Sequence, residues 1–233
     1  MRILLLAVTV LMSLFEVAAA QAPAQGGMAP PDMTRRPRQR APEATPQQQA
    51  APATVDASLA EVEQYVNSIR TLQARFVQNN PNGSVGQGTL YVRRPGRMRF
   101  EYDPPSKLKI VADGSQVTMW NTATRDFGQW PIGWTAASFL VKEPFRLSGD
   151  LKLENVERAN GLLALTMTQV RKPQEGRVIV RLAENPLQLR GWSIIDGRGQ
   201  RVDVALSNVQ TGGQLADSLF HFDGPDPSTM NRN

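Results

Sequence analysis

The hydrophobic period of this chain changes near residue 70, and this change limits its possible folds more than any other feature. After that point apolar and polar residues alternate with a period of two, which is typical of strands with one buried face. Turn sequences such as Asp113-Gly114 and Asn160-Gly161 separate the runs. The pattern predicts strands at 72–77, 86–92, 97–102, 107–112, 117–121, 162–168, 178–182, 187–195 and 202–209.

Helical patterns occur at two places. Ser58-Leu59-Ala60-Glu61 has the form of a capping box, and apolar residues then recur with helical spacing as far as Ile69. We therefore expect a helix from Ser58 to residues 68–71. A second, shorter helix is expected over 135–141, with Thr135 as its cap. Long antiparallel strands with few helices indicate an α+β fold, in which a large curved sheet bends at glycines such as Gly86 and Gly88 and helices cover its concave side.

The first twenty residues have the pattern of a signal peptide. Arg2 precedes the uncharged apolar run 3–15, and Ala18-Ala19-Ala20 offers small residues for cleavage after Ala20. The run has thirteen residues, whereas a membrane-spanning helix needs about 20, so a permanent anchor is the weaker interpretation. Export of a chain without cysteine suits an envelope compartment, in which packing rather than cross-links must stabilise the fold.

Residues 21–56 are rich in Ala, Pro, Gln and Arg, and we expect a disordered linker there. Its arginines at 35, 36, 38 and 40 could contact anionic lipid or nucleic acid, or they could simply keep a disordered segment in solution. The folded domain is expected over 57–223, with a C-terminal tail at 224–233.

Composition excludes several kinds of chemistry. The chain has no cysteine and one histidine, His221, so disulfides, thiolate metal sites and thiol nucleophiles are excluded, and a Ser-His triad is hard to assemble. A hydrolase with paired carboxylates is the enzyme alternative, but the acidic residues are scattered over polar faces and turns. We expect no catalytic residues, metal or cofactor. The net charge of +5 is too small and too dispersed to predict nucleic-acid binding.

The block from Gln87 to Pro105, QGTLYVRRPGRMRFEYDPP, resembles the signature of the periplasmic outer-membrane lipoprotein carrier proteins, the LolA family. The leading helix, the turn at 112–114 before 117–120 and the closing residues 219–222 support this resemblance, which covers about 57–223. The chain departs from the family pattern at 121–124, where Asn-Thr-Ala-Thr replaces a frequent Tyr-Pro. Its long linker is also unusual for the family.

The resemblance implies an open half-barrel of about eleven strands with helices as a lid over an apolar cavity. Such a protein acts in the periplasm, and it is expected to be a monomer. Its partners would be lipoprotein acyl chains, an ABC-type release complex of the inner membrane, and a receptor on the outer membrane or that membrane itself. The receptor protein of that pathway is anchored to lipid through a cysteine. This chain has no cysteine, which favours the soluble carrier over the receptor. A lipid-sensing or phospholipid-binding module on the same scaffold is the alternative.

Arg94 is the residue on which the strand pattern and the resemblance agree. Counting by twos from Leu90 and Val92 places Arg94 on the interior face, where a guanidinium needs acceptors such as helix-end carbonyl groups. In the family, an arginine at this motif position latches the lid. The alternative is a turn-side arginine that curls into solvent before Pro95.

The same parity, together with the covering helices, predicts which residues line an acyl-chain cavity. Methionine suits such a cavity because its side chain is flexible and polarisable. Plain core packing is the alternative for each position taken alone. Trp130 and Trp134 could lie at the cavity mouth or at a partner interface. The predicted cavity residues are Val66, Ile69, Leu90, Val92, Met98, Phe100, Val117, Met119, Phe139 and Leu140.

Overall fold

The computed structural model describes residues 52–134 and 136–224. The expected signal peptide, most of the expected linker, the Thr135 cap and most of the expected tail lie outside these residues. Helix α2 (Pro52–Ser68) begins before Ser58, so the expected start at the capping box is wrong. Proline is well tolerated in the first turn of a helix, because its missing N–H has no partner there. The helix thereby includes residues 52–56, which the sequence pattern assigned to the linker.

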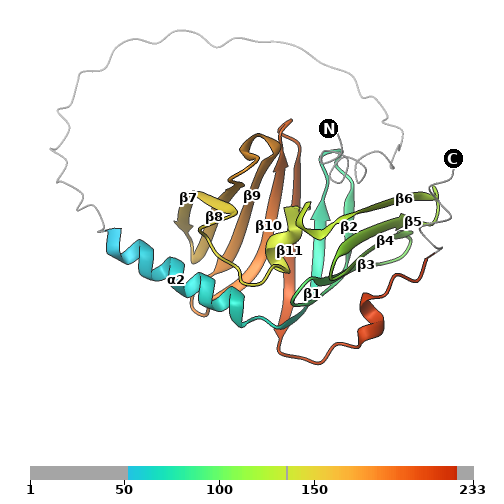
Figure 1. Ribbon diagram of the computed structural model, residues 1–233, viewed down its shortest axis with the longest axis horizontal. Helices are drawn as coiled ribbons and strands as arrows, with labels where there is room; N and C mark the ends of the chain where they lie inside the picture. Colours follow the sequence, from blue (N-terminus) through green and yellow to red (C-terminus); the bar gives the residue numbers. More distant parts are fainter. Residues whose placement is uncertain (1–51, 135, 225–233) are drawn as a thin grey trace, which may run out of the picture.

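Eleven strands form one antiparallel sheet that is open at both edges, with β6 at one edge and β7 at the other (Figure 1). The order is β6-β5-β4-β3-β2-β1-β11-β10-β9-β8-β7, so the first and last strands of the chain are neighbours in the middle. The strands are β1 (Thr71–Asn79), β2 (Val85–Arg93), β3 (Arg97–Tyr102), β4 (Leu108–Asp113), β5 (Gln116–Asn121), β6 (Asp126–Pro131), β7 (Leu151–Ala159), β8 (Leu162–Gln169), β9 (Gly176–Ala183), β10 (Gln188–Asp196) and β11 (Arg201–Thr211).

The expected α+β half-barrel is confirmed, and each of the nine expected runs coincides with a strand. The pattern missed the two edge strands. No residue of β6 is fully buried, and β7 is exposed at most positions. An edge strand has one neighbour and little burial, so its sequence carries a weak alternation. The short helix expected over 135–141 corresponds to a 3-10 turn, η3 (Ala136–Leu140), and a further 3-10 turn that was not expected, η2 (Ile132–Trp134), precedes it.

The register places the predicted interior residues on one face. Leu90 pairs with Phe100, and Val92 pairs with Met98 in the next strand. Close approach explains one of the two glycines expected at the bend: a Cβ on Gly88 would lie 2.0 Å from the carbonyl oxygen of Glu101. Only glycine fits there without moving the neighbouring backbone.

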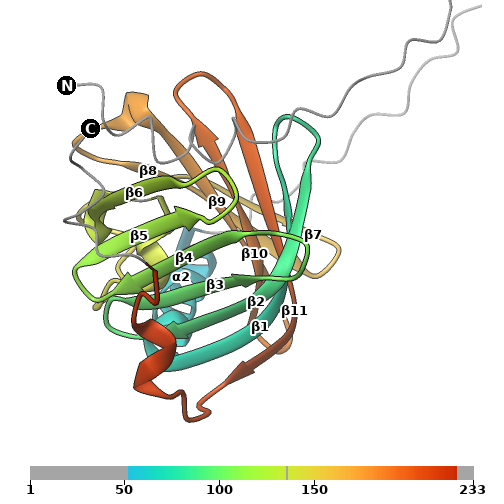
Figure 2. The same ribbon diagram turned by 90° about the vertical axis from the view of Figure 1, so that its right-hand side faces the viewer.

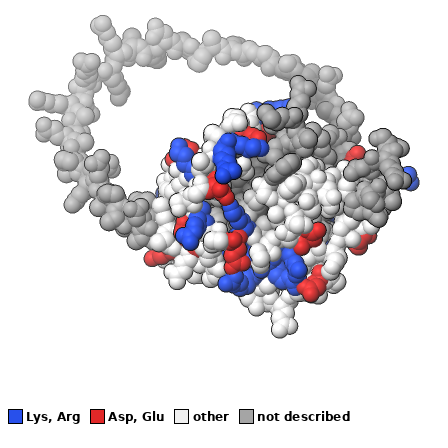
Figure 3. Space-filling view, in the orientation of Figure 1, with Lys and Arg blue, Asp and Glu red and all other residues white. Residues whose placement is uncertain are grey.

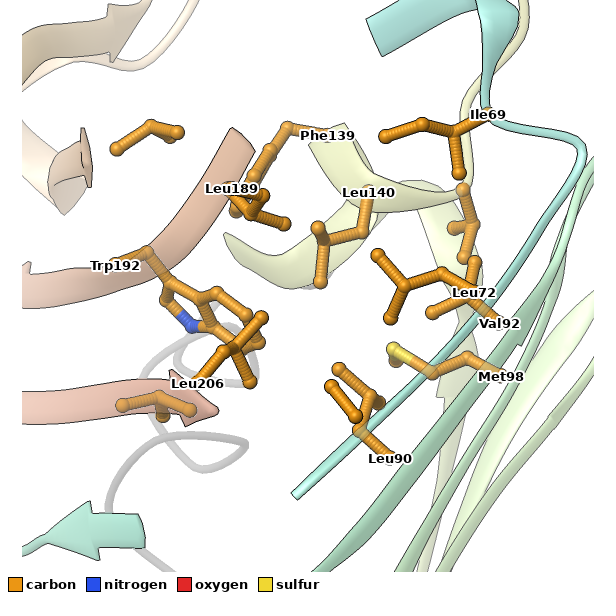
Figure 4. Packing of buried hydrophobic residues seen from close by; sticks show 14 of the residues in the cluster. Ile69, Leu72, Leu90, Val92, Met98, Phe139, Leu140, Leu189, Trp192 and Leu206 are labelled. Carbon is orange, nitrogen blue, oxygen red and sulfur yellow. The ribbon is translucent and has the colours of Figure 1, made fainter. Parts of the chain in front are cut away.

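Helix α2 lies across the concave side of the sheet, and the segment from η2 to residue 150 lies beside it (Figures 1 and 2). We call residues 141–150 the covering loop. Figure 4 shows the interior, where Leu90, Val92 and Met98 face Leu189, Trp192 and Leu206 from the other half of the sheet. Trp192 is 1% exposed, and its ring lies 6.3 Å from that of Phe100 and 5.8 Å from that of Phe139. It therefore joins both halves of the sheet to the cover.

The C-terminal segment 214–224 crosses the convex side of the sheet (Figure 2). It includes the 3-10 turn η5 (Asp217–Phe220), whose Phe220 is buried beneath the Arg93 guanidinium at 4.8 Å. Arg93 also pairs with Asp217, and Lys109 pairs with Asp223 at 2.9 Å. The segment is thus fixed from outside to strands β2 and β4.

Candidate lipid-binding site beneath helix α2

Arg94 joins the sheet to both parts of its cover. Its backbone follows β2 and donates a hydrogen bond to the Arg70 carbonyl at 2.8 Å, and its side chain is 6% exposed. The guanidinium donates to the carbonyl oxygens of Val66 in α2 and of Lys142 in the covering loop. Burial lowers the pKa of Arg94 from its ordinary value, but a guanidinium remains charged at any physiological pH. The alternative of a solvent-exposed Arg94 does not hold.

Two polar residues of α2, which the sequence did not single out, bind the covering loop directly. Asn67 exchanges two hydrogen bonds with the backbone of Phe145: its amide donates to the carbonyl at 2.9 Å, and its oxygen accepts from the N–H at 2.8 Å. One turn earlier, Glu63 accepts a hydrogen bond from the Leu147 N–H at 2.6 Å. These bonds give the irregular loop backbone the partners it needs when buried.

The helix is also bound to the opposite half of the sheet. The Leu189 N–H in β10 donates to the Tyr65 hydroxyl at 2.9 Å, and burial raises the pKa of Tyr65. On the outside, Arg70 forms an ion pair with Glu143 of the covering loop. The polar contacts therefore lie around the edge of the interior, and the interior itself is apolar.

A small pocket of about 20 Å³ lies in the interior between the cover and the sheet. A space of that size is enough for about one water molecule and much too small for an acyl chain. The structure is therefore a closed form, in which the side chains of the cover occupy the concave side of the sheet. The pocket is lined by Val62, Val66, Ile69, Leu72, Val92, Phe139, Leu140, Phe145, Leu165, Val180 and Leu189.

Nine of the ten predicted cavity residues belong to the central hydrophobic cluster or pack against it, and Met119 is buried outside that cluster. Five of the ten line the small pocket: Val66, Ile69, Val92, Phe139 and Leu140. The prediction missed the contribution of the C-terminal half of the sheet, namely Leu165, Val180 and Leu189. Their alternation was visible in the runs 162–168, 178–182 and 187–195, but no sequence motif marked it.

Trp130 lies on the edge strand β6 and is half-buried. It pairs with Val117 across β5 and β6, and its ring covers Gly128, where a Cβ would lie 2.2 Å from the ring. The side chain of Trp134 lies outside the described residues. Charges of both signs are interleaved on the face seen in Figure 3. Within 52–134 and 136–224, no cluster of three or more His, Asp or Glu side chains is arranged for a metal, and no helix is long and apolar enough to span a membrane.

An open antiparallel sheet whose apolar concave side is covered by a helix and a loop defines the class of protein to which this fold belongs. The chain belongs to the family described as "Outer membrane lipoprotein carrier protein LolA", whose model matches residues 67–223. It is 31% identical over 176 residues to an outer-membrane lipoprotein carrier protein of Methylococcus capsulatus, covering 69% of this chain and 81% of that one. It is 29% identical over 168 residues to the carrier protein of Legionella pneumophila, covering 69% and 82%. A solved LolA superfamily protein from Nitrosomonas europaea shares 10% identity at a TM-score of 0.40, over 71% of this chain and 98% of that one.

Proposed function

We propose that this chain is a periplasmic carrier that encloses the acyl chains of lipoproteins between its sheet and its cover. It takes them from an ABC-type release complex of the inner membrane and delivers them to a receptor on the outer membrane, or to that membrane itself. Family membership supports this proposal, as do the relatives named outer-membrane lipoprotein carrier proteins. The N-terminal signal pattern, with cleavage after Ala20, supports export.

The observation that carries the proposal is the position of Arg94 beneath the cover. One buried guanidinium binds a carbonyl of α2 and a carbonyl of the covering loop, directly above an apolar interior. When α2 and the loop move apart to admit a ligand, both bonds break. When the ligand leaves, both bonds form again, so closure offsets part of the cost of release.

The free energy of acyl-chain burial and the free energy of the two Arg94 hydrogen bonds are both large enough for this mechanism. An acyl chain of roughly 16 carbons in water costs about 13 kcal/mol at about 0.8 kcal/mol per methylene, so transport through an aqueous compartment needs an enclosed site. A carrier must also release its ligand without a nucleotide. Two hydrogen bonds from a charged donor, each contributing about 1.5–3 kcal/mol, lower the cost of emptying the site without preventing its occupation.

The ligand site forms only in the open state. Movement of the cover withdraws Val66, Ile69 and Phe139 from the pocket and leaves the apolar face of the sheet free. The exposed sheet residues then line the space that acyl chains occupy. Residues from both halves of the sheet contribute, so the ligand lies across the middle strands β1 and β11.

The test uses the chain from residue 21 onward and a fluorescent triacylated lipopeptide. We expect a soluble one-to-one complex that passes the lipopeptide to added acceptor vesicles. Failure of the chain to dissolve the lipopeptide would reject the carrier function. Firm retention in the presence of acceptor vesicles would instead favour the alternative, a lipid-sensing module.

A further inference from the structure

A second and much larger cavity lies on the open side of the covering loop. This cleft has a volume of about 820 Å³ and extends from the turn at Pro95-Gly96 to the end of β8. Its floor includes Phe139 and Phe145, which also line the small interior pocket. These two rings therefore separate the open cleft, whose lining includes charged side chains, from the closed apolar interior.

The polar lining of the cleft has more positive than negative charge. Four Lys or Arg residues line it, against two carboxylates, those of Glu143 and Asp150. Both carboxylates are already neutralised, Glu143 by Arg70 and Asp150 by Lys142. The basic residues are Lys142, Arg146, Arg171 and Lys172.

Two of these cations remain available. Lys172 is bound to Glu175 at 3.0 Å, whereas Arg146 and Arg171 are exposed and form no ion pair or side-chain hydrogen bond within the described ranges 52–134 and 136–224. Arg171 contributes to the lowered pKa of Asp150, so it already lies near one anion of the cleft. Guanidinium groups bind phosphate through paired hydrogen bonds.

We infer that the cleft binds the anionic headgroup of an acylated ligand whose chains pass the Phe139–Phe145 wall into the interior. Arg146 and Arg171 contact the headgroup, and its chemical class is a phosphate diester linked to acyl chains, as in an anionic phospholipid. This inference rests on the proposed function, because it uses the same interior for the chains. It adds a preference for ligands with a phosphate headgroup, which a site that binds only acyl chains would not show.

The test compares ligands with identical short chains and different heads. Dioctanoyl phosphatidylglycerol, dioctanoylglycerol and inorganic phosphate are each titrated against the chain holding phenylnaphthylamine, an uncharged fluorescent probe of apolar sites. We expect the phosphatidylglycerol to displace the probe at about a tenfold lower concentration than dioctanoylglycerol, because two guanidinium contacts add roughly 1.4 kcal/mol. The preference should weaken with added salt. Inorganic phosphate should not displace the probe.

Variants then locate the preference. Arg146→Gln with Arg171→Gln should abolish it and leave the affinity for dioctanoylglycerol unchanged. Arg125→Gln with Arg198→Gln removes the same charge from exposed positions outside the cleft and should keep the preference. Asp150→Asn should increase the preference, because it removes a competing anion.

The outcomes separate this inference from the proposed function. Equal affinity for the two lipids, or a preference that survives in the Arg146/Arg171 variant, overturns the headgroup site and leaves the carrier intact. Probe displacement by inorganic phosphate also overturns it, since the anion would then bind without chains. Failure of every lipid to displace the probe rejects the acyl-binding interior itself.

Discussion

The hydroxyl of Tyr65 accepts a hydrogen bond from the backbone N–H of Leu189 at 2.9 Å, and this bond ties α2 to the half of the sheet that Arg94 does not reach. Arg94 holds the C-terminal end of the same helix from the other half. The cover is therefore attached on both sides of the interior. Opening requires at least one attachment to break, which makes the two residues separately testable.

Replacement of Arg94 by Leu should leave acyl binding intact and slow release. The closed form loses two charge-assisted bonds, about 3 kcal/mol in total, which corresponds to release slowed by roughly 100-fold. The measurement is the transfer rate of a fluorescent lipopeptide to vesicles. Arg93→Leu is the matched control, since Arg93 contacts Asp217 and Phe220 on the convex side. Normal delivery by Arg94→Leu would remove the latch role.

Replacement of Tyr65 by Phe should lower the free energy of unfolding by about 1–2 kcal/mol, because the Leu189 N–H loses its partner. Uptake of an acyl probe should become faster, since one attachment of the cover is lost. Urea denaturation and stopped-flow fluorescence measure the two effects. Tyr91→Phe serves as the control, because Tyr91 lies on a strand away from α2. Unchanged uptake by Tyr65→Phe would show that this bond does not restrain opening.

Replacement of Asn67 by Ala should loosen the covering loop more than the helix. Two hydrogen bonds of the Asn67 side chain go to the Phe145 backbone, so their loss leaves two backbone groups unpaired. Asn67 Oδ1 also accepts a long hydrogen bond of 3.5 Å from the Arg94 guanidinium. We expect a stability loss of about 2 kcal/mol and faster hydrogen exchange at residues 141–150. Gln64→Ala, at an exposed position of the same helix, is the control. Exchange that stays slow in the Asn67 variant would contradict this function of the side chain.

The C-terminal segment should detach in acid. The hydrogen bond from Arg93 lowers the pKa of Asp217, and the hydrogen bond from Lys109 lowers the pKa of Asp223. A lowered folded pKa stabilises the attached form above the unfolded value of about 3.9, and this stabilisation is lost as the pH falls through the folded values.

Pepsin, which is active in acid and cuts beside large apolar residues, measures this detachment. Cleavage near Phe220 should increase as the pH falls below about 3.9, relative to the denatured chain at each pH. The variant Asp217→Asn with Asp223→Asn should be cleaved readily at pH values where the unchanged chain resists. Equal cleavage of both proteins across the range would show that these ion pairs do not hold the segment.

The sequence predicted most of the sheet because its central strands are buried on one face, and burial imposes alternation. It predicted the inward direction of Arg94 for the same reason, since Leu90 and Val92 set the parity of β2. It could not predict the bonds of Asn67, whose partner Phe145 is 78 residues away. Nor did it show that the interior is closed, because the same apolar residues can line a cavity or fill a core. Whether these residues fill a core or line a cavity depends on how closely the cover packs against the sheet, and the hydrophobic period of the sequence does not contain that information.

A cross-link on the Arg94 side of the cover tests the central claim that acyl chains enter only when the covering loop lifts from the sheet. The chain has no cysteine, so Arg70→Cys with Glu143→Cys replaces the outer ion pair by a single pair of thiols that a short, cleavable cross-linker can join. The account predicts that the cross-linked protein fails to bind the lipopeptide and that cleavage of the linker restores binding. Equal binding by the cross-linked and cleaved forms would contradict it.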